Sequence, residues 1–355
     1  VEVAVRLGMA GYDAELGNSV FFEHGQHATS ITGAMGSSVA AAMIYGLDAQ
    51  GISDVLGITA SMAAGVIEAN RTGGTVKRLH CGVAAQAGVT AAQLVKRGFT
   101  GPPTVLEGRF GFFQGWLHGQ FFPTAITEKL GVEWSVPGIF FKPYPANHFT
   151  HTTIDAARRL RERGIKPEDV AEVTIGVAEP TVRTIGEPAE IKRRPDTGYQ
   201  AQFSAPYTFV AGLLGGSGLG VGLPDFTDEL AVDPQRRDLM RRVTVVGDER
   251  CNAIFPHQFP AIVRLITSTG EVLVEEVMVN RGGSQDPLTD AELEEKFAAN
   301  VGDRLPAHTV SMLLDRARKL TALKSVDDLL DPLGVSMEPN AAQQRLSDNS
   351  GAINV

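Results

Sequence analysis

Three segments of the sequence combine side chains that can move protons or hold anions. The first is Gly25-Gln26-His27-Ala28-Thr29, in which His27 stands just ahead of an Ala-rich stretch. A histidine at a helix entrance can act as a general base, because its ordinary pKa of about 6.5 is close to working pH. The alternative is a histidine that only caps or packs against the helix.

The second segment is Lys77-Arg78-Leu79-His80-Cys81-Gly82, which precedes a predicted helix. Backbone amides at a helix N-terminus carry positive potential, so Lys77 and Arg78 at this position could cradle a carboxylate or a phosphate. The alternative is a solvated basic turn.

The third segment runs from Lys142 to His151 and contains two prolines that favour an extended backbone. Its polar side chains are of several kinds, since Asn147 and His148 lie between the lysine and the last histidine. A plain linker would not need them. Metal binding is a competing interpretation, but two histidines without a nearby carboxylate or cysteine are a weak ligand set, and we expect no metal.

Two further segments are a hydroxyl-bearing turn and a glycine-rich run. Ser204 and Tyr207 lie in Gln202-Phe203-Ser204-Ala205-Pro206-Tyr207, ahead of an apolar helix. Residues 215–222 look like a dinucleotide-binding loop, but no register gives GxGxxG and Leu223-Pro224 follows where a helix should begin. No nucleotide cofactor is expected.

The elements that would position these side chains fall into helical and mixed regions. Small residues at helical spacing in 36–70 predict tightly packed helices, with a break at Gly46 and a restart near Ser53 and Asp54. A further helix is predicted over 82–96, ending at Gly98. These helices are apolar on more than one face, so they need partners on several sides.

The region after Trp134 mixes helix and strand. A helix is predicted over 151–163, with Thr152 and Thr153 as candidate caps, and strands over 170–177, 242–246, 261–266 and 272–279. Thr289-Asp290-Ala291-Glu292 predicts a capping box, and a last helix is expected over 308–320.

This pattern predicts a mainly α fold in which an all-helical domain is combined with an inserted α+β lid domain. The predicted boundaries are 1–136 for the helical domain, 137–285 for the α+β lid domain, 286–334 for C-terminal helices that return to the helical domain, and 335–355 for a flexible tail. Clefts between two such domains are common ligand sites.

The bulk properties narrow the class of partner. With 32 Lys and Arg against 41 Asp and Glu, the net charge of −9 disfavours nucleic acid. Two cysteines without CxxC spacing fit a reducing compartment, so the cytoplasm is expected. No apolar run approaches the roughly 20 residues that span a bilayer, so no membrane partner is expected. The chain begins with Val1 in a helix-like pattern, which suggests that preceding residues are missing.

Taken in order, these segments resemble the MmgE/PrpD family over about residues 1–333. Residues 75–85 resemble its Lys-x-Leu-His-x-Gly-x-Ala-Ala signature, and 142–156 its Lys-x-Tyr-Pro pattern ending in His and Ile-Asp-Ala. Residues 202–207 resemble its Phe-Ser-x-Pro-Tyr turn. The remaining similar segments are 98–102, 106–108, 111–112 and 287–297.

The resemblance implies a cofactor-free lyase that acts on a small polycarboxylic acid, generally as a homodimer. The family includes 2-methylcitrate dehydratase, an activity of propionate metabolism, cis-aconitate decarboxylase and iminodisuccinate epimerase. We expect the dehydratase type, with the decarboxylase and the epimerase as alternatives. The resemblance implies catalytic roles for His27, Lys77, Lys142 and Tyr207. Expected substrate-binding residues are Arg78, His80, Asn147, His151 and Ser204.

Two departures from the family pattern bear on these expectations. Asn147 stands where many members carry Cys or His. The family's N-terminal acidic motif, an Asp-rich stretch ending in His, has no counterpart, so the chain is expected to lack the family's N-terminal segment. A complementing segment or subunit would then complete the site. The rival function is a catalytically silent subunit that binds or scaffolds.

Overall fold

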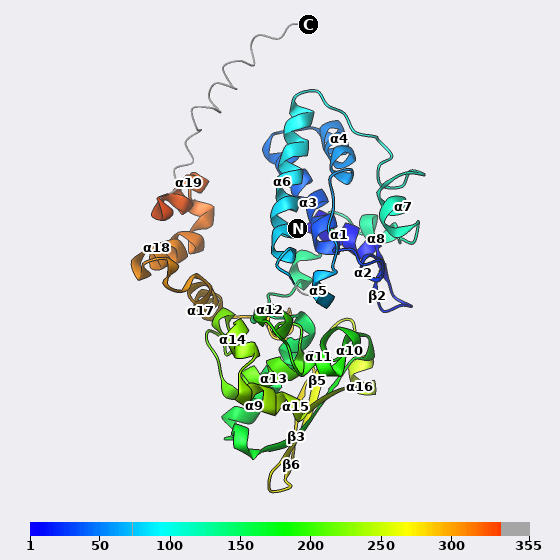
Figure 1. The fold of residues 1–355 in the computed structure, drawn as a ribbon. Coiled ribbons are helices and arrows are strands. Elements are labelled where there is room, and N and C mark those ends of the chain that lie inside the picture. Colours follow the sequence, from blue (N-terminus) through cyan, green and yellow to red (C-terminus); the bar gives the residue numbers. More distant parts are fainter. Residues whose placement is uncertain (73, 335–355) are drawn as a thin grey trace. The chain divides into compact units, whose positions relative to one another are not determined.

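The structure is a computed structural model that describes residues 1–334 except Gly73. The predicted flexible tail, 335–355, lies outside the described residues. The chain divides into two compact units, Val1–Leu288 and Thr289–Val355. The first unit contains a helical part and an α+β part (Figure 1). The predicted fold class, mainly α with an α+β portion, is confirmed. The predicted domain boundaries stay predictions.

The helical part is built on two long helices that lie side by side, α3 (Ala28–Ile44) and α6 (Lys77–Lys96) (Figure 1). Both are rich in Ala, Gly and Ser, which allow close backbone approach. The other helices of this part are α1 (Glu2–Ala10), α2 (Val20–Glu23), α4 (Ala49–Ala60), α5 (Ala69–Thr72), α7 (Phe112–Leu117) and α8 (Thr124–Thr127). Strands β1 (Tyr12–Asp13) and β2 (Asn18–Ser19) form a short antiparallel pair.

The contact between α3 and α6 leaves no room for side chains at its closest point. A Cβ atom added at Gly88 would lie 2.5 Å from the amide nitrogen of Ser38. Four residues earlier on α6, the carbonyl of Ala84 accepts a hydrogen bond of 2.8 Å from the Ser37 hydroxyl. Small residues therefore set the distance between the two helices.

Two predicted helix starts are corrected. Helix α4 begins at Ala49 rather than near Ser53, because the Asp48 carboxylate accepts from the Gly51 amide at 2.9 Å and caps the helix there. Helix α6 begins at Lys77, five residues before the predicted start, so the whole basic segment forms its first turn.

The α+β part is organised on a four-stranded sheet of order β4-β3-β5-β6. Strand β3 (Val170–Val177) is parallel to β4 (Val243–Gly247) and antiparallel to β5 (Ala261–Thr267), which pairs with β6 (Val272–Val277). The four predicted strands are confirmed. Helices α9 (His151–Glu162) and α13 (Ala205–Leu214) pack on each other, and each also contacts strands of the sheet.

The start of α9 differs in detail from the prediction. Its N-cap is Thr150, whereas Thr152 and Thr153 lie in the first turn and are buried. They are not caps, because the chain enters the helix from a short 3-10 turn, His148–Thr150, which is capped by Asn147. The smaller helices of this part are α10 (Glu179–Ile185), α11 (Ala189–Lys192), α12 (Gly198–Ala201), α14 (Asp228–Ala231), α15 (Pro234–Arg241) and α16 (Glu249–Asn252).

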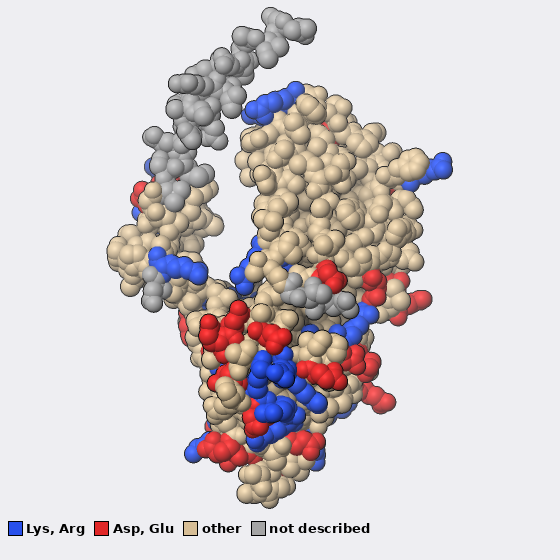
Figure 2. All heavy atoms as spheres, in the orientation of Figure 1, with Lys and Arg blue, Asp and Glu red and all other residues tan. Residues whose placement is uncertain are grey.

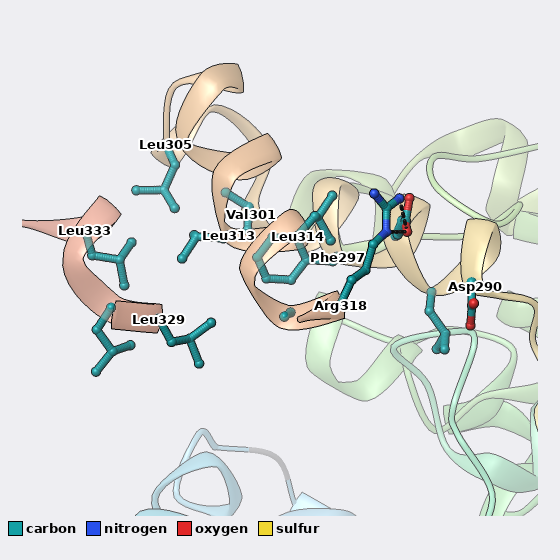
Figure 3. Close-up of a pocket in the computed structure, with 13 residues that line it drawn as sticks. Asp290, Phe297, Val301, Leu305, Leu313, Leu314, Arg318, Leu329 and Leu333 are labelled. Carbon is teal, nitrogen blue, oxygen red and sulfur yellow. Dashed lines mark hydrogen bonds and ion pairs between the residues drawn. The ribbon is translucent and has the colours of Figure 1, made fainter. Parts of the chain in front are cut away.

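The second unit contains α17 (Asp290–Val301), α18 (Ala307–Arg318) and α19 (Val326–Leu330) among its described residues. The predicted capping box is confirmed, since the Thr289 amide donates to Glu292 at 2.7 Å and Thr289 Oγ1 accepts from the Glu292 amide. The helices line an open, largely apolar pocket of about 900 Å³ (Figure 3). Its apolar lining comprises Leu293, Phe297, Val301, Leu305, Leu313, Leu314, Ala317, Leu329, Leu330 and Leu333.

Charge is unevenly distributed on the first unit. On the face drawn in Figure 2, Lys, Arg, Asp and Glu gather over the α+β part, whereas few lie on the helical part. Helix α6 exposes apolar side chains along one face, at Leu79, Val83 and Val89. None of the helices in the described part of the chain has the length and hydropathy of a membrane-spanning helix.

Candidate active site

A pair of histidines forms the centre of the candidate site. His27 is the N-cap residue of α3, and His80 lies in the first turn of α6. Their Nδ1 atoms are 2.8 Å apart, a hydrogen-bond distance, and the imidazole of His27 makes no capping bond. The Ser30 hydroxyl donates 2.6 Å to the Ala64 carbonyl and lies 3.3 Å from the backbone carbonyl of His80. His27 is therefore not a simple helix cap.

Two lysines surround this pair with positive charge. Burial lowers the pKa of His27 to about 4, and the charges of Lys77 and Lys142, with that of His80, add to the effect. Burial also lowers the pKa of both lysines, and Lys142 lowers that of Lys77 further. The charges of Lys77 and Lys142 thus both act on His27, and the catalytic roles of the three residues stay predictions. We call these three residues with His80 and His148 the histidine–lysine cluster.

The side chain of Lys142 is exposed, although the surrounding protein is dense enough to lower its pKa. Lys77 is half-buried, donates 3.1 Å to Asn70 Oδ1 and lies over the Phe203 ring at 5.2 Å. Neither ammonium forms an ion pair with a carboxylate in the described part of the chain. Two cations without acidic partners make an environment suited to an anion.

His148 is the fifth member of the cluster. Burial lowers its pKa to about 4, with a further contribution from the charge of Lys142. Its ring packs between Phe140 and Phe259, with centroid distances of 5.0 and 4.9 Å. Its Nε2 atom is buried and has no hydrogen-bond partner among the described residues. His151, a predicted substrate-binding residue, is fully buried behind it, 3.3 Å from the Ala146 carbonyl.

A buried polar network holds the segment that carries Lys142. The hydroxyl of Tyr144 donates to the Asp155 carboxylate and accepts from Arg158 at 2.8 Å and from Arg281 at 3.1 Å. Tyr144 is fully buried, and burial raises its pKa and that of Asp155. This network joins the segment to α9 and to the loop after β6.

Asn147 and Arg78, two predicted substrate-binding residues, lie outside the cluster. Asn147 Oδ1 accepts from the Phe149 backbone amide at 3.0 Å, and the backbone N–H of Asn147 donates 2.8 Å to the Gln202 carbonyl, so Asn147 shapes the turn that bears His148. Arg78 is exposed, and its charge acts on the hydroxyl of Tyr199.

Ser204 and Tyr207 are two further predicted site residues outside the cluster. Ser204 caps α13, because its hydroxyl accepts from the Tyr207 amide at 3.0 Å and donates to the Lys192 carbonyl. The Tyr207 hydroxyl donates 2.5 Å to the Asp225 carbonyl and lies 3.4 Å from Arg236. Burial raises the pKa of Tyr207 to about 12. Its hydroxyl is committed to the α+β part, so the structure does not support it as a donor to a bound substrate.

Sequence reasoning missed three polar residues next to the cluster. Asn70 receives the hydrogen bond from Lys77, and Lys192 donates 3.0 Å to the backbone carbonyl of Phe203. Tyr199 packs against the Phe203 ring at 5.4 Å, and its buried hydroxyl has no partner among the described residues. None of them stands in a motif that marks it out, since Lys192 and Tyr199 lie in a polar run, 192–200, that reads as an ordinary solvated segment.

Within residues 1–334, Gly73 excepted, no three His, Cys, Asp or Glu side chains are grouped so that they could hold a metal ion. The two cysteines are unpaired, with Cys81 exposed and Cys251 buried.

Comparison with known proteins shows the family to which the chain belongs. Residues 2–124 match the MmgE/PrpD N-terminal domain, and residues 144–321 match the MmgE/PrpD C-terminal domain. The chain therefore belongs to the MmgE/PrpD family. The chain was predicted to lack the family's N-terminal segment, but its residues 2–124 do match the family's N-terminal domain.

Curated relatives include cis-aconitate decarboxylases and a 2-methylcitrate dehydratase. Human cis-aconitate decarboxylase is 28% identical over 343 residues, which are 93% of this chain and 67% of the human protein. The mouse cis-aconitate decarboxylase is 29% identical over 326 residues, 89% of this chain and 64% of the mouse protein. A mitochondrial 2-methylcitrate dehydratase of Yarrowia lipolytica is 24% identical over 276 residues, 72% of this chain and 49% of that protein. The chain thus spans about two thirds of the length of these decarboxylases.

Proposed function

We propose that the protein is a lyase that removes a proton next to a carboxylate of a small polycarboxylic acid and eliminates water, as 2-methylcitrate dehydratase does. The observation that carries this proposal is a neutral histidine on which the charges of two lysines act, neither of which has an acidic partner in the described chain. The lysines suit a substrate with several carboxylates, and the neutral imidazole suits proton removal.

Each residue of the site has a separate role in the proposed reaction. His27 takes the proton through Nε2, and the electron pair of the broken C–H bond moves into the neighbouring carboxylate as an enolate. Lys77 and Lys142 stabilise the charge that develops there. The enolate then expels the hydroxyl group, which leaves as water after it receives a proton. Tyr199, whose hydroxyl is buried near Phe203, is a better candidate for that donor than Tyr207.

Decarboxylation of cis-aconitate is the second candidate. It is favoured by the higher identity to cis-aconitate decarboxylases, 28% and 29%, than to the 2-methylcitrate dehydratase, 24%. Loss of carbon dioxide also leaves a carbanion that two lysines can stabilise, but this carbanion must then gain a proton. A histidine with a pKa of about 4 is a poor proton donor at neutral pH.

The direct test is an assay of the full chain with 2-methylcitrate, cis-aconitate and iminodisuccinate, with products followed by NMR. We expect turnover of 2-methylcitrate to the unsaturated acid, which Lys77→Ala abolishes and Lys166→Ala, at an exposed lysine, leaves unchanged. Carbon dioxide release from cis-aconitate would instead support the decarboxylase. A folded chain that turns over none of the three would support the rival, a binding or scaffolding subunit.

We further propose that the protein is a homodimer in the cytoplasm. The apolar face of α6, at Leu79, Val83 and Val89, supports a partner for the helical part. Two unpaired cysteines are compatible with a reducing compartment. Light scattering of the purified chain should give twice the mass of one chain, and Leu79→Glu should give a single-chain mass.

A further inference from the structure

A cavity of about 600 Å³ lies beside the histidine–lysine cluster, between the helical and α+β parts of the first unit. This volume is within the range of about 300 to 1,000 Å³ that holds whole small ligands. The helical part contributes Gly25, two residues before His27, and Asn70, which binds Lys77. The cavity therefore lies next to the cluster.

The opposite wall of the cavity carries a cation that the reaction above does not use. Lys192, the last residue of α11, lines the cavity and is partly buried. Its ammonium donates 3.0 Å to the Phe203 carbonyl, and it forms no ion pair with any acidic side chain in the described part of the chain. Burial lowers its pKa to about 8. A buried cation without a counter-ion is costly unless an anion completes its surroundings.

Phe203 connects this lysine to the cluster. Its ring lies under the ammonium of Lys77, and its carbonyl accepts from Lys192. Phe203 thus contacts two lysines on different helices, Lys77 through its ring and Lys192 through its carbonyl. Asn70 lines the cavity and also accepts the hydrogen bond of Lys77. The other cation of the cavity, Arg183, forms an ion pair with Glu23 and is therefore less available to bind an anion.

Much of the remaining lining is apolar, namely Phe22, Val66, Ile67, Pro188 and Ile191, but the carboxylates of Glu68 and Glu187 also line the cavity and disfavour an anion away from Lys192. Such a wall suits carbon atoms, and it suits a charged group only where a cation stands. Lys192 is that cation.

We propose that this cavity receives the third carboxylate arm of a tricarboxylate substrate and that Lys192 is the residue that selects it. Lys77 and Lys142 hold the other two carboxylates, and the apolar wall contacts the carbon atoms of the arm. The inference rests on the proposed function for the assignment of those two carboxylates. It makes Lys192 a specificity-determining residue rather than a participant in proton transfer.

The test compares two unreactive ligands that differ by one carboxylate, propane-1,2,3-tricarboxylate and glutarate, by titration calorimetry. The unchanged protein should bind the tricarboxylate at least about tenfold more tightly, the value of one hydrogen bond to a charged group. In Lys192→Met this preference should disappear while the affinity for glutarate stays the same. Lys192→Arg should restore part of it, and Lys166→Met should behave as the unchanged protein.

A second variant covers the case in which Lys192→Met does not fold. Thr184 lines the same cavity, and Thr184→Asp adds a negative charge there. It should weaken binding of the tricarboxylate and spare that of glutarate. Equal losses for both ligands in either variant, or an unchanged preference in both, would overturn the proposal, as would failure of the unchanged protein to distinguish the ligands.

The two proposals can fail separately. A preference that depends on Lys192, without turnover of any lyase substrate, would leave the subsite standing and remove the proposed reaction. Turnover of 2-methylcitrate with no effect of Lys192→Met on ligand preference would support the proposed reaction and overturn the subsite.

Discussion

His27 and His80 meet through their Nδ1 atoms at 2.8 Å, although 53 positions separate them in the chain. Only one of the two nitrogens can carry the shared hydrogen when both rings are neutral. If His27 donates, its Nε2 atom keeps a lone pair and can accept a proton. If His80 donates, Nε2 of His27 carries a hydrogen and cannot be a base. Acceptance by His80 therefore selects the active tautomer of His27.

The first prediction follows from this role of His80. His80→Ala should lower kcat on the order of 10-fold or more, because His27 loses the acceptor that fixes its tautomer. His80→Asn should retain more activity, since the amide oxygen of Asn can stand near the position of Nδ1. Steady-state kinetics on the substrate identified above would measure both. Equal kcat values for the Ala and Asn variants would contradict a role in tautomer selection.

The second prediction concerns Lys77. Replacement by Ala should lower kcat by about 10²-fold to 10³-fold, the usual loss when one charge-stabilising donor is removed, and should raise KM. Lys77→Arg should restore only part of the rate, because a planar guanidinium cannot reproduce a point ammonium beside Asn70 and Phe203. Kinetics of both variants against Lys166→Ala provide the check. Unchanged kinetics in the Ala variant would remove Lys77 from the mechanism.

The third prediction concerns stability in acid. The pKa of His148 is about 4 in the folded protein and about 6.5 in the unfolded chain, so the unfolded chain binds more protons between these values. The free energy of unfolding should therefore fall as pH drops from 6.5 to 4, by no more than about 3 kcal/mol from this group, and this contribution is constant above pH 6.5.

His148→Phe should remove that contribution, because the ring lies among Phe140 and Phe259 and its Nε2 has no partner in the described chain. Denaturant unfolding at several pH values from 7 to 4 measures the difference from the unchanged protein. The exposed His257, replaced by Gln, is the matched control. A variant that loses stability in acid as steeply as the unchanged protein would refute the assignment.

The fourth prediction concerns the network under Lys142. Tyr144→Phe removes the hydroxyl that serves Asp155, Arg158 and Arg281 and should cost about 1 to 3 kcal/mol of stability, since buried polar groups lose their partner. Thermal unfolding would measure it. Tyr12→Phe is a suitable comparison, because the Tyr12 hydroxyl is buried without a partner among the described residues. A cost no larger than that of Tyr12→Phe would show that the network is not important for stability.

The sequence predicted residues in polar segments that lie beside a helix signal and missed those that only tertiary contacts bring to the site, although Lys192 and Tyr199 also stand in a polar run. His27, Lys77 and Lys142 could be chosen because each lies in a run of polar groups beside a helix signal. Tyr207 was chosen in the same way, but the local pattern does not reveal that Asp225 and Arg236 occupy its hydroxyl. Lys192 and Tyr199 become visible only when both are found around Phe203.

The same reasoning applies to the fold. Alternation in 170–177 and Gly270 in the turn between β5 and β6 were sufficient to predict strands, because period and turn chemistry are local. The start of α4 was misjudged because Asp48 caps the helix from within a segment read as a break. The parallel pairing of β3 with β4 depends on contacts between segments about 70 residues apart, which no local pattern specifies.

The close approach of α3 and α6 at Gly88 matters for anyone who redesigns this protein. The distance between the two backbones there determines how far apart His27 and His80 lie at the other end of the helix pair. Gly88→Ala would meet the Ser38 amide and should cost about 1 to 3 kcal/mol, and the strain would displace one helix against the other. A mutant library that aims to change substrate choice should therefore vary the cavity wall at Val66, Ile67 and Ile191 and keep Gly88 fixed. Otherwise many clones would be inactive because of substitutions at Gly88, which is far from the reacting groups.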